Sequence, residues 1–94
     1  MVNVIQNMTD FLTLPTQGMI KERTHICLYA SILVLSQQHG SSDTIEVSRR
    51  KLMSLSKIKS FATYHKCISE LENCGYIKYM PSYHPIFGSQ IVIL

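Results

Sequence analysis

The sequence predicts an α+β domain in which helices pack against a small antiparallel sheet. Three observations lead to this prediction: an almost wholly apolar helical segment over residues 19–39, a second helical stripe within residues 60–74, and two short apolar runs near the C-terminal end. The chain has 94 residues, which is enough for one domain. Its apolar fraction of 46% and charged fraction of 16% are typical of a globular protein.

The domain proper is expected at residues 19–94, with residues 1–18 forming an N-terminal arm. Val4 and Ile5 are compatible with an extended segment and equally with the start of a short helix. Pro15 disfavours helix at the residue before it. The arm is therefore left open in its secondary structure.

The segment 19–39 is expected to be the central helix of the core, because a helix that is apolar on most sides is buried on most sides. Gly40 supplies a left-handed stop at its end. After a short loop, residues 44–47 alternate between polar and apolar types, which predicts a short strand.

A second helix is predicted from Arg49 to about Leu55, capped by Ser48 and directing Leu52 and Leu55 to one side. The turn that follows it spans residues 56–59 and contains Ile58, the apolar residue needed to pack the turn down. The second helix and its turn are thus expected to lie on the core.

A third helix is predicted from the cap residue Ser60 to about Cys74, and Gly75 ends it. Its apolar positions are spaced three, four and three residues apart, which places them on one helical stripe: Phe61, Tyr64, Ile68 and Leu71. Residues 76–80 and 90–94 then read as two strands of a hairpin, joined by a loop at residues 81–89.

Part of this core follows a recognisable pattern, Ser-x-x-Thr-apolar-x-basic-x-Ile-x-x-Leu-x-x-x-Gly-apolar-Ile. The residues in those places are Ser60, Thr63, Tyr64, Lys66, Ile68, Leu71, Gly75, Tyr76 and Ile77. In this, residues 48–77 resemble the helix-turn-helix core of winged-helix transcriptional regulators, and the chain is also similar to winged-helix modules of plasmid replication initiators. The resemblance implies a winged helix-turn-helix fold, with a three-helix core, a small antiparallel sheet and a C-terminal β-hairpin as the wing. It also implies sequence-specific binding of double-stranded DNA.

Charge is distributed unevenly along the chain, although the formal net charge is only +3. The segment from Ser48 to Ser69 holds no acidic residue and six basic ones: Arg49, Arg50, Lys51, Lys57, Lys59 and Lys66. A run of one sign within one structural unit suits a polyanionic partner. The alternative is a solvated basic face with no partner.

The third helix is the expected reading element, because a helix fits the major groove and its N-terminal residues reach the base edges. The DNA-binding residues predicted near that end are Ser60, Ala62, Thr63, His65 and Lys66, with Ala62 small enough to approach a thymine methyl group. Lys66 resembles the basic position that contacts phosphate in the family. Contacts to the DNA backbone are predicted for the second helix and the turn, at Ser48, Arg49, Arg50, Lys51, Lys57 and Lys59.

The predicted wing, residues 81–89, departs from the family because it carries no lysine or arginine. Together with apolar residues in the arm, this keeps a second hypothesis open: a winged-helix module for protein contact, or the DNA-binding part of a plasmid or mobile-element replication or recombination complex. Pairing of two copies is a further possibility, since a small basic domain gains affinity from two half-sites.

Enzyme and metal functions are not expected. The pairs His25 with Cys27 and His65 with Cys67 have i, i+2 spacing, which points their side chains to different helix faces and is unlike zinc ligand spacing. The sequence lacks a Gly-rich phosphate loop, a GxSxG elbow and an HExxH motif. We therefore expect no catalytic residue, no metal and no cofactor.

The compartment expected is a reducing cytoplasm, because three cysteines without CxxC spacing are typical of small apolar side chains rather than a disulfide framework. The longest apolar stretch, from Ile26 to Leu35, is too short to span a bilayer, so we expect no membrane partner.

Overall fold

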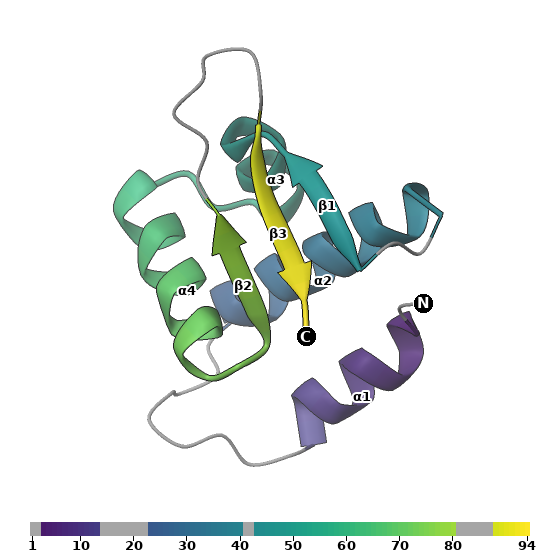
Figure 1. Ribbon diagram of the computed structural model, residues 1–94. Coiled ribbons are helices and arrows are strands. Elements are labelled where there is room, and N and C mark those ends of the chain that lie inside the picture. The colour runs from purple at the N-terminus through teal and green to yellow at the C-terminus, as the bar shows by residue number, and fades with distance from the viewer. Residues whose placement is uncertain (1–2, 14–22, 41–42, 81–87) are drawn as a thin grey trace.

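The computed structural model describes residues 3–13, 23–40, 43–80 and 88–94 (Figure 1). Two helices come first along the chain, and a strand, two more helices and two further strands follow. Within these residues the elements are α1 (Val4–Thr13), α2 (Arg23–Gln38), β1 (Thr44–Val47), α3 (Arg49–Ser56), α4 (Phe61–Asn73), β2 (Ile77–Met80) and β3 (Ser89–Ile93). The α+β class and the small antiparallel sheet are confirmed, and one helix more than the predicted three is present. No helix among the described residues is long and apolar enough to cross a membrane.

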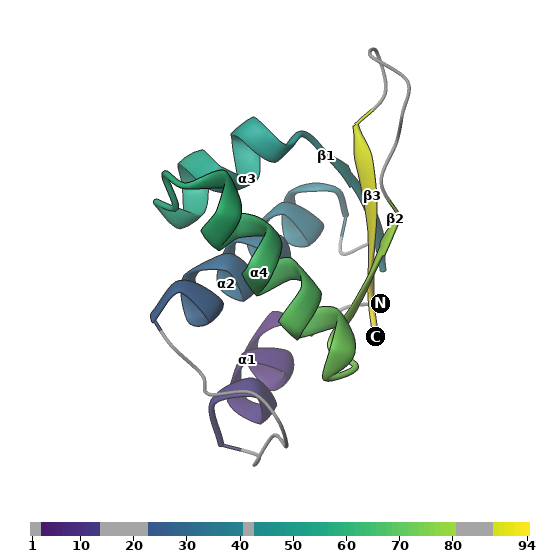
Figure 2. The ribbon, with the colours of Figure 1, turned by 90° about the vertical axis from the view of Figure 1, so that its left-hand side faces the viewer.

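The three strands form one sheet in the order β1-β3-β2, with both pairings antiparallel. The last strand therefore lies between the other two, and its Ile91 faces Ile45 of β1 while its Ile93 faces Ile77 of β2. These four isoleucines are buried, because alternate residues of a strand point to the same face. Figure 2 shows the sheet edge-on, with the helices gathered on one side of it.

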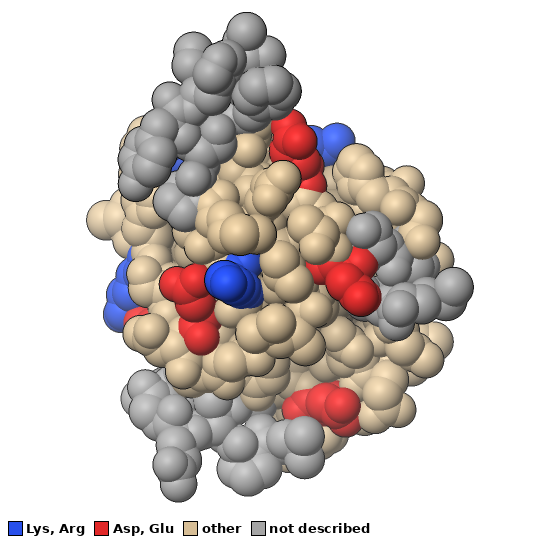
Figure 3. Space-filling view, viewed as in Figure 1, with Lys and Arg blue, Asp and Glu red and all other residues tan. Residues whose placement is uncertain are grey.

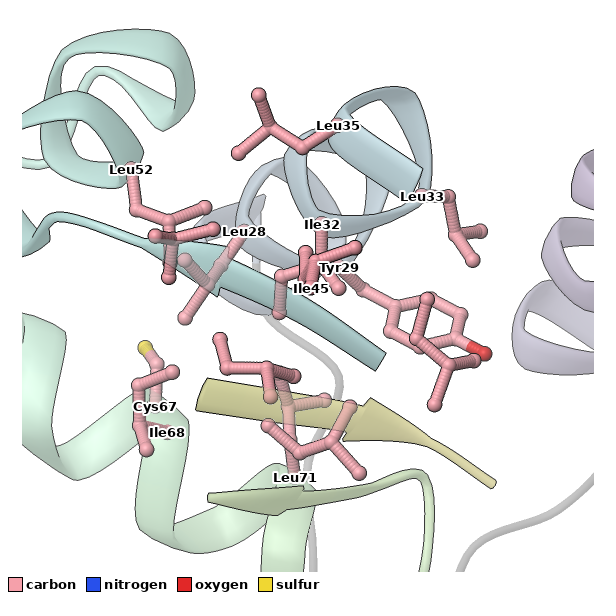
Figure 4. Close-up of a cluster of buried hydrophobic side chains, with 14 of the residues drawn as sticks. Leu28, Tyr29, Ile32, Leu33, Leu35, Ile45, Leu52, Cys67, Ile68 and Leu71 are labelled. Atoms are coloured by element: carbon pink, nitrogen blue, oxygen red, sulfur yellow. The ribbon is translucent and has the colours of Figure 1, made fainter. Parts of the chain in front are cut away.

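Helix α2 lies at the centre of the core, as its sequence predicts. Leu28, Ile32 and Leu33 are fully buried. Leu28 and Ile32 lie toward side chains of β1, α3 and α4, whereas Leu33 points to the side of α1 (Figure 4). Leu52 of α3 and Leu71 of α4 enter the same cluster. The packing of α3 and α4 against α2 and the sheet fixes the orientation of the helix pair that the sequence singles out.

Helix α1 lies in the segment expected as an arm, and it contributes to the same core. Phe11 is fully buried, and its ring centroid lies 4.5 Å from that of Tyr29 in α2 and 4.8 Å from that of Tyr76, just before β2. The rings of Tyr29 and Tyr76 are themselves 5.5 Å apart. Three aromatic rings thus join α1, α2 and the start of β2.

The predicted bounds of the second and third helices agree closely with those of α3 and α4, because the local signals are present. The predicted start of the central helix at residue 19 lies outside the described residues. Ser48 accepts a hydrogen bond from the Lys51 amide at 3.1 Å, and Ser60 accepts one from the Thr63 amide at 3.4 Å. Gly75, which follows α4, takes a left-handed φ of 82°.

The exact end of α3 was harder to predict from the sequence, because the residue that takes the left-handed conformation there is not a glycine. Lys57 adopts a φ of 62°. The amide of Ile58 donates to the Met53 carbonyl at 3.1 Å, which closes the helix in the manner usually found with glycine. Ile58 is buried, as predicted, and its burial holds this conformation in place.

Two apolar positions were predicted wrongly. Phe61, counted in the buried stripe of α4, is 59% exposed, and Leu55 of α3 is 44% exposed. Cys67 is buried within the stripe instead, beside Tyr64, Ile68 and Leu71. Phe61 is the first residue of α4, at the end of the stripe, so its spacing alone does not bury it.

Candidate nucleic-acid interface

The candidate interface is the surface formed by α3, the turn after it, and the first turns of α4. Figure 2 shows α4 running from α3 toward β2, so that its N-terminal end lies beside α3 and its C-terminal end lies beside the sheet. The two serine caps start these helices within one surface. The predicted second and third helices are therefore present, and they are adjacent.

The predicted site residues are accessible. All are exposed except Thr63, which is half-buried, and the exposed ones are Ser48, Arg49, Arg50, Lys51, Lys57, Lys59, Ser60, Ala62, His65 and Lys66.

One group of side chains joins the start of α3 to α4. The Cζ atom of Arg49 lies 4.6 Å from the centroid of the Phe61 ring, and its Nη1 donates to Nε2 of His65 at 3.4 Å. The His65 ring in turn meets the buried Tyr64 ring edge to face, with centroids 5.4 Å apart. Arg49 and His65, predicted separately from the sequence, are thus brought together, and Phe61 is added to them.

Tyr64 anchors this group from below. It is fully buried, and among the described residues its hydroxyl has no hydrogen-bond partner. Burial raises the pKa of the Tyr64 hydroxyl well above its usual value, and the nearby Tyr79 raises it further, while the Arg49 cation opposes both. Tyr64 therefore stays neutral at physiological pH, and its ring serves as a fixed support for His65.

The two carboxylates of α4, those of Glu70 and Glu72, are engaged by other groups of the fold. Glu70 Oε2 lies 2.8 Å from Nε2 of the buried His25, and Glu70 Oε1 lies 3.9 Å from the Lys66 ammonium. Glu72 accepts the Tyr79 amide of β2 at 2.8 Å. Within the described residues, Lys66 is the one member of the basic set that has a carboxylate at salt-bridge distance.

The sheet face has a different character. Figure 3 looks onto this face and shows acidic groups at several separate points with few basic groups among them. Glu46 of β1 accepts the Gly88 amide at 3.3 Å, which fixes one acid near the base of the hairpin. Among the described residues, the sheet therefore offers no continuous basic surface, whereas α3 and its turn carry the exposed basic set.

Two features of the interface were missed from the sequence. Phe61 was placed on the apolar stripe of the third helix, although its place directly after the cap residue puts it at the very end of that stripe. His25 was considered only as a zinc ligand together with Cys27 and rejected on spacing, whereas it is 1% exposed and linked to Glu70, 45 residues away along the chain. Nothing in the local sequence reveals that pairing.

The wing lies largely outside the described residues, since these omit 81–87. Within the described residues, no group of three or more His, Cys, Asp or Glu side chains is arranged to hold a metal ion.

Replacement of Glu70 with alanine is expected to lower the free energy of unfolding by about 1–3 kcal/mol, because His25 is buried and loses a hydrogen-bond partner. Glu70→Gln keeps a side-chain oxygen able to accept from His25, so we expect a smaller loss. Urea unfolding of the two variants and the wild type, followed by circular dichroism, measures the difference. Equal losses in both variants would contradict a structural role for this hydrogen bond.

Comparison of the chain with protein-family models, with curated proteins and with solved structures found no match.

Proposed function

We propose that this chain is a winged-helix domain that binds double-stranded DNA with sequence specificity, acting in the cytoplasm as a transcriptional regulator. The observation that carries the proposal is the exposed basic set of α3 and its turn, which adjoins the N-terminal end of α4 and includes no acidic residue. The order of helices and strands and the β1-β3-β2 sheet are compatible with the winged-helix arrangement and support it.

In this proposal α4 enters the major groove by its N-terminal end. The exposed Ser60, Ala62 and His65 lie on its first two turns, where side chains of a recognition helix reach base edges. The capped N-terminus adds partial positive charge toward a phosphate. Ala62 leaves room for a thymine methyl group, and His65 offers a polar ring edge.

Affinity comes from the DNA backbone contacts. Arg50, Lys51, Lys57 and Lys59 are exposed, and among the described residues none has a carboxylate at salt-bridge distance. Their charges are therefore available to phosphates, which set affinity and register without reading sequence.

The positions of the acids favour this orientation of α4. Glu70 lies eight residues beyond Ala62, which corresponds to roughly 12 Å along a helix. The Debye length at physiological ionic strength is about 8 Å. The carboxylate of Glu70 therefore repels a phosphate beside the first turn of α4 only weakly.

The test is a fluorescence anisotropy titration of the protein with labelled duplexes, first from a random pool and then with sequences selected from it. With about five phosphate contacts, the logarithm of the association constant is expected to fall with the logarithm of salt concentration at a slope of about −4.5. Enrichment of a defined sequence from the pool is expected as well. An association constant that does not change with salt concentration, or the absence of any binding at 50 mM salt, would overturn the proposal.

A second candidate, a winged-helix module for protein contact within a replication or recombination complex, is favoured by one observation. Ile5 and Leu12 of α1 are 80% and 55% exposed, although they are large apolar residues. Large exposed apolar side chains that gather in one patch mark interaction surfaces. Failure of the DNA titration together with self-association in light scattering would favour this candidate.

A further inference from the structure

Phe61 stands out because a large aromatic side chain is 59% exposed at the first position of α4, within a basic surface. The Phe61 ring contacts a cation, since the guanidinium of Arg49 lies over it with Cζ 4.6 Å from the ring centroid. A planar guanidinium on an aromatic face is a favourable arrangement that lysine does not reproduce as well.

A second contact fixes the rotation of the same guanidinium. Arginine has donors and no acceptor, so the 3.4 Å contact between Arg49 Nη1 and His65 Nε2 has Arg49 as donor. His65 rests against Tyr64, which is fully buried. The guanidinium is therefore held from two sides by groups that lead back to the core.

No comparable arrangement holds the other basic side chains of the surface. Among the described residues, the side chains of Arg50, Lys51, Lys57 and Lys59 have no ion pair or aromatic contact, and Lys66 has only the 3.9 Å contact to Glu70. Arg49 is thus distinguished by its fixed orientation.

We propose that Phe61 and His65 are positioning residues that hold Arg49 as a two-pronged donor to one phosphate of the DNA backbone. This inference rests on the proposed function. One of the five N–H donors of Arg49 is engaged by His65, and the remaining ones include a pair that can meet two oxygens of a phosphate. Arg49 opens α3 rather than α4, and the helix that precedes the recognition helix crosses the backbone instead of reading bases.

Phe61 and His65 together form a clamp on Arg49. This clamp lowers the side-chain entropy that Arg49 loses when it binds a phosphate. A free guanidinium must give up side-chain rotation to make two parallel hydrogen bonds, whereas one already held by Phe61 gives up less. The positioning residues therefore act on affinity without adding a charge.

The experiment is a double-mutant cycle of Arg49→Lys and Phe61→Leu, measured by anisotropy on the duplex selected by the wild type. Each single variant is expected to bind about fivefold more weakly, since an exposed cation–π contact of 0.5–1 kcal/mol corresponds to about two- to fivefold and the loss of bidentate geometry adds to it. The salt slope is expected to be unchanged, because both variants keep the charge at position 49. The double variant is expected to be no weaker than the weaker single variant.

Arg23→Lys is the matched control, because Arg23 is exposed at the start of α2, outside the α3–α4 surface, and has no aromatic partner among the described residues. We expect the affinity of this variant to stay within about twofold of the wild type, because the substitution keeps the charge and lies away from the proposed phosphate contacts. Multiplicative effects of Arg49→Lys and Phe61→Leu, or an equal loss in Arg23→Lys, would overturn the clamp while leaving the proposed function standing. Absence of wild-type binding would overturn the proposed function instead, and the clamp with it.

A readout without DNA separates the clamp from general loss of folding. In ¹⁵N relaxation measurements on the free protein, the Nε–H group of Arg49 is expected to be more ordered than that of Arg50, and Phe61→Leu is expected to release it. Arg49 mobility equal to that of Arg50 in the wild type would overturn the clamp.

Discussion

Replacing four basic residues with alanine in one variant is expected to weaken DNA binding roughly 10³-fold at 0.1 M salt. The four residues are Arg50, Lys51, Lys57 and Lys59. Each lost phosphate contact lowers the salt slope by about 0.9, so four contacts lower it by about 3.6. The electrostatic part of the affinity vanishes near 1 M salt, so the variant and the wild type bind about equally there. At a tenfold lower salt concentration, the slope difference of about 3.6 makes the association constant of the variant lower by more than three powers of ten. Anisotropy titrations at four salt concentrations give the slope and the affinity together.

The control separates location from net charge. Lys51→Ala with Lys59→Ala removes two charges from the surface, whereas Arg23→Ala with Lys78→Ala removes two exposed charges from α2 and β2. We expect about 60-fold weaker binding for the first pair, since two contacts lower the slope by about 1.8, and less than about threefold for the second. Equal losses in the two pairs would mean that binding follows net charge and not the α3–α4 surface.

Phe11→Ala is expected to lower the free energy of unfolding by about 3–5 kcal/mol, the usual cost of removing a buried aromatic side chain. Phe11 is fully buried between Tyr29 and Tyr76, so its loss leaves a cavity where α1 meets α2. Small domains are stable by only about 5–15 kcal/mol, and the change is therefore a large share of the total. Urea unfolding followed by circular dichroism measures it.

Leu12→Ala is the matched control for this result. Leu12 is the next residue of α1 and is 55% exposed, so we expect a change within about 0.5 kcal/mol. Similar small losses in both variants would show that α1 does not pack on the domain in solution. A large loss for Phe11 alone supports a domain that includes α1.

The helix pair of the candidate site was predictable because its signals are local. Ser48 and Ser60 each place a hydroxyl three residues before an amide that needs an acceptor, and Gly75 relieves the left-handed residue after α4. Such contacts span a few residues, and the sequence carries both partners side by side. The exposure of the basic set followed for the same reason, since charged side chains on the far side of an apolar stripe face water.

The features that depend on contacts between residues far apart in the chain became visible only in the three-dimensional structure. The segment at residues 1–18 contains a helix that is fixed by rings from α2 and the start of β2, and no local signal predicts those rings will meet. The same holds for His25 and Glu70, and for β3 lying between β1 and β2.

The α+β class and the basic helix pair were determined by the sequence alone, because periodicity, caps and charge are properties of neighbouring residues. Only the tertiary structure decided that Phe61 lies outside the core, under Arg49 and near His65. The reason is geometric. A helical stripe specifies which residues share a face, whereas the length over which that face is covered depends on where the neighbouring helix ends.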